Sequence, residues 1–225
     1  MPTTKKIAVL ASGGLDSSIL IHYLLKKYKF VQPIYIQNGH VWEKAELAWL
    51  KKFLKAIRSP RLKPLALLSL PTQDLYQTHW SLTGKKTPGA KSHDKEVYLP
   101  GKNIFLIAKA SVFCALKKIP LLALGPLKTN PFPDASPSFF KNIGQACSQG
   151  LNYQLRILTP FLKLSKKEVM TLGRFLPLQL TFSCLAPVRA GLPHPHLHCG
   201  RCNKCMERKC AFRNSRLIDK TRYAH

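Results

Sequence analysis

Short apolar runs alternate along the chain with longer segments in which apolar residues recur at helical spacing. The apolar runs predict buried strands at Ile7–Leu10, Val31–Ile36, Pro64–Leu70 and Leu121–Leu124. The helical spacing predicts helices at Asp16–Tyr28, Trp42–Ile57, Ile104–Leu116, Pro137–Gln149 and Lys166–Phe175. Because strands that alternate with helices form a parallel sheet covered on both faces, we expect an α/β fold, a doubly wound sheet of the Rossmann type.

Two stretches depart from this alternation. Residues 72–101 are polar and rich in glycine and proline, which predicts an irregular excursion near the carboxyl ends of the strands. From Phe182 onward, prolines, histidines and cysteines replace the apolar spacing. We therefore expect an α/β domain over residues 1–181 and a cysteine-rich tail over 182–225 that packs on the same domain.

The first strand runs into a turn with two adjacent glycines, Leu10-Ala11-Ser12-Gly13-Gly14-Leu15-Asp16-Ser17-Ser18. Glycines allow a tight turn and a close approach of the backbone to a ligand. The helix that follows offers unpaired N–H groups and the positive end of its dipole, and Ser12, Ser17 and Ser18 add hydroxyl donors. These features predict a phosphate site. The order Ser-Gly-Gly-x-Asp-Ser resembles the PP-loop of ATP pyrophosphatases, which lacks the lysine of a P-loop.

The charge balance is strongly basic, with 36 Lys and Arg against 10 Asp and Glu and a formal net charge of +26 over 225 residues. A polyanionic partner such as tRNA would explain the excess. The alternative is a solubility trait without a specific partner. The lysine pairs are spread along the whole chain, and this dispersal favours the second interpretation.

Cysteine usage and hydropathy indicate the compartment. No apolar run is long enough for a membrane span, and the early strand leaves no room for a signal peptide. The cysteines number seven, an odd count, and several cluster late in the chain. This pattern is more typical of metal ligands in a reducing cytosol than of a disulfide framework, so we expect a cytoplasmic protein with no membrane partner.

Four late cysteines have the spacing of a metal site: Cys184, Cys199, Cys202 and Cys205. Four thiolates suit tetrahedral zinc, although iron–sulfur centres also use closely spaced cysteines. Cys210 and His198 could replace one of the four. Cys114 and Cys147 lie on predicted helices among apolar neighbours, where a cysteine is usually a small buried hydrophobic residue.

The ordered motifs together resemble the QueC family, the 7-cyano-7-deazaguanine synthases. Beyond the turn at Ser12–Ser17 the resemblance covers nearly the whole chain, through Leu99-Pro100-Gly101-Lys102-Asn103, Asn130-Pro131-Phe132-Pro133-Asp134, Leu158-Thr159-Pro160, Leu164-Ser165-Lys166, Thr181-Phe182-Ser183-Cys184, the late cysteines and Asp219-x-Thr221-x-Tyr223.

The resemblance implies an ATP-dependent ligase that converts 7-carboxy-7-deazaguanine with ammonia to the nitrile through an acyl-adenylate and an amide. It implies catalytic roles for Asp16, Ser17, Lys102 and Lys166, and ATP binding by the turn from Leu10 to Ser18. It implies substrate contacts at His40, Asn103, Phe132 and Asp134, bound Mg²⁺ and Zn²⁺, and a homodimer. Plainer roles are a helix cap for Asp16, a turn or cap for Asp134, and solvation for the lysines.

Two segments depart from the family pattern. Ala135-Ser136 follows Asp134 where the family commonly has Cys-Arg, so a carboxylate-binding arginine is missing. Ile36-Gln37-Asn38-Gly39-His40 stands where the family commonly has Tyr-Gly-Gln-Arg-His. Both changes fall where the purine should bind, which keeps open a QueC-like paralogue that activates another carboxylate or acceptor. The basic charge keeps open a second alternative, a PP-loop enzyme that modifies tRNA.

Overall fold

The computed structural model describes residues 3–191 and 196–225, and its centre is one parallel sheet. The strand order is β3-β2-β1-β4-β5. These strands span Thr3–Leu10 (β1), Tyr28–Gln37 (β2), Ala66–Ser69 (β3), Leu121–Ala123 (β4) and Arg156–Leu158 (β5). The four predicted strands are present. The fifth was missed because β5 is short, begins at an exposed arginine and is otherwise only half-buried.

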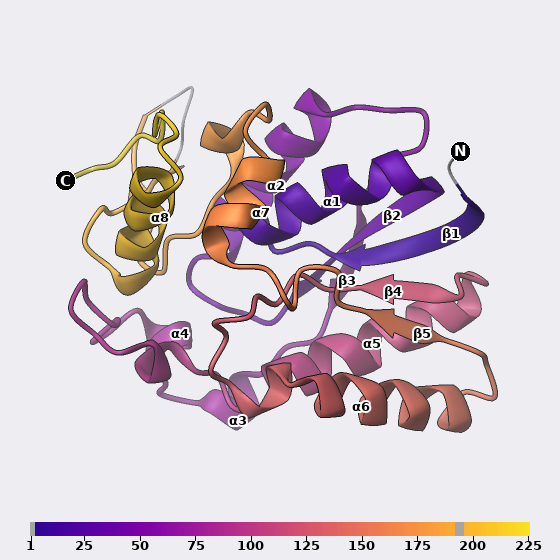
Figure 1. The fold of residues 1–225 in the computed structure, drawn as a ribbon. Helices are drawn as coiled ribbons and strands as arrows, with labels where there is room; N and C mark the ends of the chain where they lie inside the picture. Colours follow the sequence, from indigo (N-terminus) through magenta and orange to yellow (C-terminus); the bar gives the residue numbers. More distant parts are fainter. Residues whose placement is uncertain (1–2, 192–195) are drawn as a thin grey trace.

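Helices cover both faces of this sheet (Figure 1). Helices α1, α2 and α7 lie on one face and α5 and α6 on the other; their bounds are Leu15–Lys27 (α1), Glu43–Ala56 (α2), Lys102–Leu116 (α5), Pro137–Gly150 (α6) and Lys166–Leu172 (α7). The doubly wound α/β expectation is confirmed. The tail adds α8 (Asn203–Asn214), whose low apolar content hid it from the periodicity.

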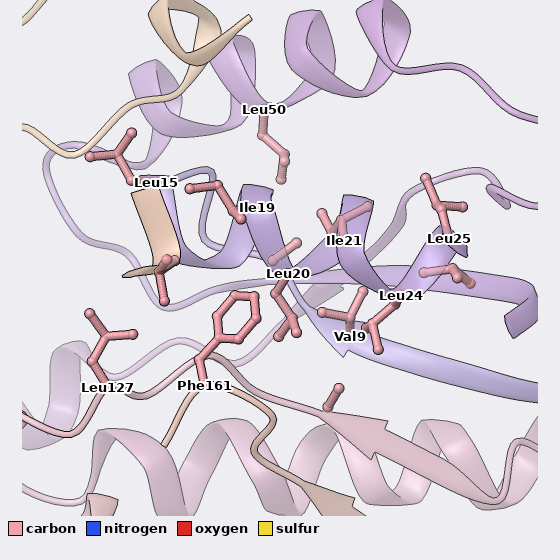
Figure 2. Close-up of a cluster of buried hydrophobic side chains, with 14 of the residues drawn as sticks. Val9, Leu15, Ile19, Leu20, Ile21, Leu24, Leu25, Leu50, Leu127 and Phe161 are labelled. Atoms are coloured by element: carbon pink, nitrogen blue, oxygen red, sulfur yellow. The ribbon is translucent and has the colours of Figure 1, made fainter. Parts of the chain in front are cut away.

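Each face of the sheet has its own hydrophobic core. On the α1 side, Ile19, Leu20 and Leu24 of α1 pack with Val9 of β1 and Phe161, all almost fully buried (Figure 2). On the other side, residues of α5 and α6 pack against β1, β2 and β4. Burial of each such side chain contributes about 1.5–3 kcal/mol, so these two layers fix the sheet that carries the loops of the site.

A third cluster joins the tail to the excursion. Residues 72–101 form short pieces, namely α3 (Gln73–Tyr76), α4 (Trp80–Thr83) and the 3₁₀ turn η1 (Asp94–Val97). Trp42 and Trp49 at α2 pack here with Val97, Phe182 and the buried cysteines. The tail also holds the hairpin of β6 (Val188–Arg189) and β7 (His196–Leu197). The remaining 3₁₀ turns are η2 (Pro133–Ala135) and η3 (Leu178–Leu180).

The strand order places a switch point at the centre of the sheet. From β1 the chain moves outward to β2 and β3, then returns to β4 on the opposite side of β1. In open α/β sheets ligands bind in the crevice outside the carboxyl ends of the strands at such a point. No helix within the described part of the chain is long and apolar enough to cross a membrane.

Candidate active site

A cavity of about 400 Å³ opens at the carboxyl ends of β1, β2 and β4. Its walls come from the turn after β1, the start of α2, the excursion, the start of α5 and the loop that follows β4. The cavity brings together nine of the residues that the sequence singled out: Leu10, Ser12, Asp16, Ser17, His40, Lys102, Asn103, Phe132 and Asp134.

The turn after β1 is held by its own serines. The backbone N–H of Ser12 donates to Ser17 Oγ over 3.2 Å, and the two hydroxyl oxygens lie 3.1 Å apart. Gly13 has φ +76°, and a Cβ there would lie 3.3 Å from both Glu46 O and Leu50 Cβ. A left-handed backbone against a packed helix therefore requires glycine. Ser18 is fully buried and lines neither this cavity nor the next.

A smaller cavity of about 160 Å³ adjoins the first around the same turn. It shares Ser12, Asp16, Ser17 and Lys204 with the larger one, and adds Gly14, Leu15, Lys166, Ser183, Glu207 and Arg208. The turn therefore separates a larger space on the sheet side from a smaller space on the tail side. This division suits a nucleotide whose base and ribose lie on one side and whose terminal phosphates lie on the other.

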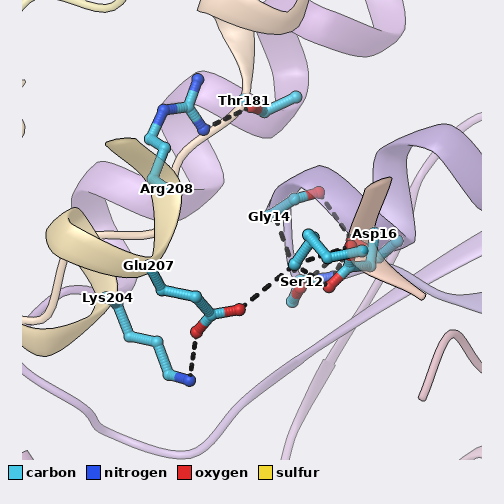
Figure 3. A network of polar contacts seen from close by, with 9 residues as sticks. Ser12, Gly14, Asp16, Thr181, Lys204, Glu207 and Arg208 are labelled. Carbon is cyan, nitrogen blue, oxygen red and sulfur yellow. Dashed lines mark hydrogen bonds and ion pairs between the residues drawn. The ribbon is translucent and has the colours of Figure 1, made fainter. Parts of the chain in front are cut away.

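A chain of ion pairs crosses the smaller cavity (Figure 3). Lys166 Nζ donates to both carboxylate oxygens of Asp16, at 2.8 and 2.7 Å, and lies 3.2 Å from Glu207. Lys204 Nζ donates to Glu207 over 2.6 Å. Burial acts to lower the pKa of Lys166, but the two carboxylates outweigh it and raise that pKa. Burial opposes ionisation of Glu207, yet both lysines lower its pKa to about 2.

The same contacts bear on the expected magnesium. Mg²⁺ takes oxygen ligands such as carboxylates. Both oxygens of Asp16 already accept from Lys166. As arranged here, Asp16 is a partner of Lys166, and a magnesium ion would share its carboxylate with this ammonium group.

The start of α5 forms the opposite wall. The backbone N–H of Asn103 donates to Asp134 Oδ2 over 3.0 Å, and Asn103 Nδ2 donates to the Asp134 carbonyl over 2.9 Å. Asp134 thus caps α5, and not the helix α6 that follows it in sequence, while it lines the cavity. Burial lowers the pKa of Lys102, although Glu46 and Glu43 oppose this.

Aromatic rings form much of the remaining wall. His40 stacks on Trp42 at 4.7 Å between ring centroids, and Trp42 stacks on Trp80 at 5.6 Å. Tyr98 stacks on Phe132 at 4.8 Å. Burial lowers the pKa of His40 to about 3, so its ring is neutral, and its buried Nδ1 has no partner among the described residues. Flat rings and an orphan ring nitrogen suit a planar heterocycle.

Sequence reasoning missed several polar residues of these cavities, among them Tyr35, Glu46, Lys204 and Glu207. Tyr35 donates to Glu46 Oε2 over 2.7 Å, and burial raises the pKa of Glu46 to about 7. A usable signal was the scarcity of acidic residues, since the chain has 10 in all. In so basic a chain, an acidic residue with apolar or cysteine-rich neighbours in the sequence is a candidate site residue.

The four late cysteines form the expected cluster. Their sulfur atoms lie within 4.8 Å of one another and all four residues are buried. Cys199 Sγ lies 3.9 Å from Cys205 Sγ, and Cys202 Sγ lies 4.0 Å from Cys184 Sγ. Zn–S bonds of about 2.3 Å in a tetrahedron place sulfurs about 3.8 Å apart. The set therefore fits one ion such as zinc, and is too compact for a multi-iron cluster.

The other thiols and the spare histidine lie outside this cluster. Backbone N–H groups of Cys199 and Leu185 donate to Cys184 Sγ and Cys202 Sγ, which supports the cluster from behind. His198 accepts from Ser183 N through Nε2 and packs on Phe182. Cys114 is buried in the core under α5, as expected for a small hydrophobic residue.

Comparison with known proteins identifies the family of this chain. The model of the family described as "Queuosine biosynthesis protein QueC" matches residues 6–216. The chain belongs to the QueC family. It is 30% identical to the 7-cyano-7-deazaguanine synthase of Leptospira interrogans, over 97% of this chain and 90% of that protein. It is also 30% identical to the synthase of Methanococcus maripaludis, over 97% and 98%.

Solved structures add only a weak likeness. A predicted tRNA methyltransferase subunit from Methanocaldococcus jannaschii is 20% identical over 75% of this chain and 74% of that chain, at a TM-score of 0.49. This likeness supports no functional inference. Membership of the QueC family makes the chain an enzyme of the PP-loop ATP pyrophosphatase class.

Of the two departures from the QueC pattern, Ile36–His40 lines the cavity through Ile36, Asn38 and His40, whereas Ala135 and Ser136 follow Asp134 outside the lining. Ser136 Oγ accepts from Phe139 N over 3.2 Å and so caps α6 at the position after buried Ala135. His40 lines the cavity and is preceded by Gly39, whose φ is +89°. In this QueC chain, the cations on the cavity wall are Lys102 and Lys204.

Proposed function

We propose that the protein adenylates the carboxylate of 7-carboxy-7-deazaguanine with ATP and converts it with ammonia to the amide and then to the nitrile. One observation carries this proposal. The phosphate-type turn at Ser12–Ser17 and the purine-type group Asn103–Asp134 line one continuous cavity, as a reaction between ATP and a purine analogue requires.

The first step is attack of a substrate carboxylate oxygen on the α-phosphorus of ATP, which breaks the bond to pyrophosphate. Ser12, Ser17, Lys166 and Lys204 would hold the departing pyrophosphate in the smaller cavity, where they meet. Catalysis then rests on positioning and on charge placed where charge develops.

The amide and then the nitrile would form in the same site. Ammonia displaces AMP from the acyl-adenylate and gives the amide with release of one proton. The amide oxygen then attacks a second ATP and releases a second pyrophosphate. Loss of AMP and a proton from this adenylated amide leaves the nitrile. Because two oxygens on the same substrate carbon are adenylated in turn, the substrate would stay bound while the spent nucleotide leaves and a second ATP enters.

The substrate side is supported by complementary groups. Adjacent N–H donors of a guanine-like edge suit the Asp134 carboxylate, and a planar ring suits the stacked Tyr98 and Phe132. Lys102 is available to meet the substrate carboxylate in place of the arginine that Ser136 replaces.

A second candidate is activation of another carboxylate or another acceptor, and the altered Ala135-Ser136 segment favours it. The deciding experiment measures release of pyrophosphate and AMP with magnesium-ATP and ammonium, with and without 7-carboxy-7-deazaguanine, and identifies the product by mass. The nitrile supports the proposal. Pyrophosphate release without amide or nitrile supports the second candidate. No stimulation by this substrate overturns the proposal.

A further inference from the structure

Basic residues that are scattered along the sequence gather at one end of the fold. The parallel topology brings the N-terminal ends of all five strands to this end, at the right of Figure 1. Twelve cations belong to the strand starts and to the helix ends beside them: Lys5, Lys6, Lys26, Lys27, Lys29, Lys55, Arg58, Arg61, Lys63, Lys117, Lys118 and Arg156.

At least one of these cations lies at or shortly before the start of each strand. In sheet order they are Lys63 before β3, Lys29 in β2, Lys5 and Lys6 in β1, Lys117 and Lys118 before β4, and Arg156 in β5. We call these residues the basic row. Neighbouring strands lie about 4.8 Å apart, so the row crosses about 19 Å. All members except the half-buried Lys63 are exposed.

No acidic residue balances the basic row. The 10 acids lie at the two cavities, in the excursion, at the start of α7 and in the tail: Asp16, Glu43, Glu46, Asp74, Asp94, Glu96, Asp134, Glu168, Glu207 and Asp219. Over residues 3–191 and 196–225, the salt bridges all belong to the cluster of Lys166 and Glu207. The basic row therefore presents uncompensated positive charge to solvent.

Helix dipoles explain only part of this arrangement. Lysines in the last turn of α1 and α2 complement the negative ends of those helices. Strand dipoles give no such reason for Lys6, Lys29 or Arg156. A row of like charges costs stability through mutual repulsion, which a counter-charged partner removes.

A groove beside the row completes the surface. It has a volume of about 350 Å³, with Lys51, Arg58 and Lys63 among its lining and Leu54, Leu62 and Leu65 as its apolar part. Lys63 belongs to both groove and row. Lys63 and Lys29 also lie over the ring of Phe30, at 4.5 and 5.7 Å from its centroid. Apolar or aromatic surface bordered by cations is the chemistry that holds a base and its phosphate.

We propose that the basic row binds a single-stranded nucleic acid through its phosphates, with the groove receiving a base. Cations that recur on each of five neighbouring strands match a polymer whose charges recur along its length, which describes a phosphodiester strand better than an acidic protein or an anionic bilayer. The surface lies at the opposite end of the strands from the cavities, and the inference does not rest on the proposed reaction.

The test is fluorescence anisotropy of a labelled mixed-sequence RNA of about 20 nucleotides, titrated with the full chain between about 50 and 200 mM KCl. The row variant is Lys29→Gln, Lys63→Gln and Lys117→Gln together. Its matched control removes equal charge elsewhere, through Lys44→Gln, Lys91→Gln and Lys163→Gln, all at exposed positions away from the row.

Each phosphate contact contributes about −0.7 to the slope of log K against log salt, so the row variant should lose about 2 from this slope. The control should keep the slope, and both variants should keep the far-UV circular dichroism of the parent. Equal slopes for the two variants would reduce the effect to net charge and overturn the proposal. So would binding to phosphatidylserine vesicles without binding to RNA.

Discussion

Replacement of Lys166 by methionine tests the ion pairs that join the phosphate turn to the tail. Methionine keeps most of the apolar stem but removes the charge that contacts Asp16 and Glu207. Exposed ion pairs contribute about 0–1 kcal/mol, whereas loss of one partner from a buried pair costs about 3–5 kcal/mol. The Lys166 and Asp16 side chains are 23% and 27% exposed, which lies between these limits. We therefore expect a loss of about 2 kcal/mol in the free energy of unfolding.

The assay is urea denaturation at neutral pH, with Lys167→Met as the matched control because Lys167 is exposed and adjacent. A urea slope of about 2 kcal/mol per molar turns the expected loss into a midpoint shift of about 1 M, against about 0.2 M for the control. The pKa of Glu207 is lowered to about 2, so its stabilisation is present above pH 4.5 and is lost as pH falls toward 2. The difference between parent and Lys166→Met should shrink over that range. Equal midpoints for the two variants would refute the reasoning.

Three further changes probe other parts of the site. Cys202→Ser should lower zinc content and melting temperature together, checked by metal analysis and calorimetry, because folding and metal binding are coupled in such sites; a stable, active, metal-free variant would contradict this. Asp134→Asn should raise the KM for 7-carboxy-7-deazaguanine, the proposed substrate, with little loss of stability, since the amide oxygen can still cap α5; an unchanged KM would remove Asp134 from recognition. Glu46→Gln should stabilise the protein by about 1 kcal/mol or more above pH 7 and not below pH 4.5, because burial raises the pKa of Glu46 to about 7 and its ionisation costs stability as pH rises; pH-independent unfolding differences would argue against a buried, titrating carboxyl.

The sequence predicted those parts of the fold whose signals are local. Apolar runs located β1 to β4, and the glycine turn at Ser12–Ser17 carries its chemistry within a few residues. Helix α8 was not predicted because its buried residues include Cys205, Arg208 and Phe212, which do not form an apolar stripe. Buried Arg208 is satisfied by Thr181, Thr221 and the Leu178 carbonyl, partners far away in sequence. Glu46 and Lys204 were missed for the same reason: they line one cavity only because tertiary packing brings distant segments together.

The path of the chain explains how a turn without a lysine acquires positive charge. The segment Leu10–Ser18 holds no cation, so the lysines that reach it come from α7 and α8. Lys204 stands between Cys202 and Cys205, two members of the thiol cluster, and an ion held there would fix the backbone on both sides of this lysine. Phe182 N donates to Gly13 O over 2.7 Å, which ties the start of the tail to the turn itself. The cysteine-rich tail is therefore part of the proposed phosphate site, because it supplies Lys204, one of the two lysines that reach the turn.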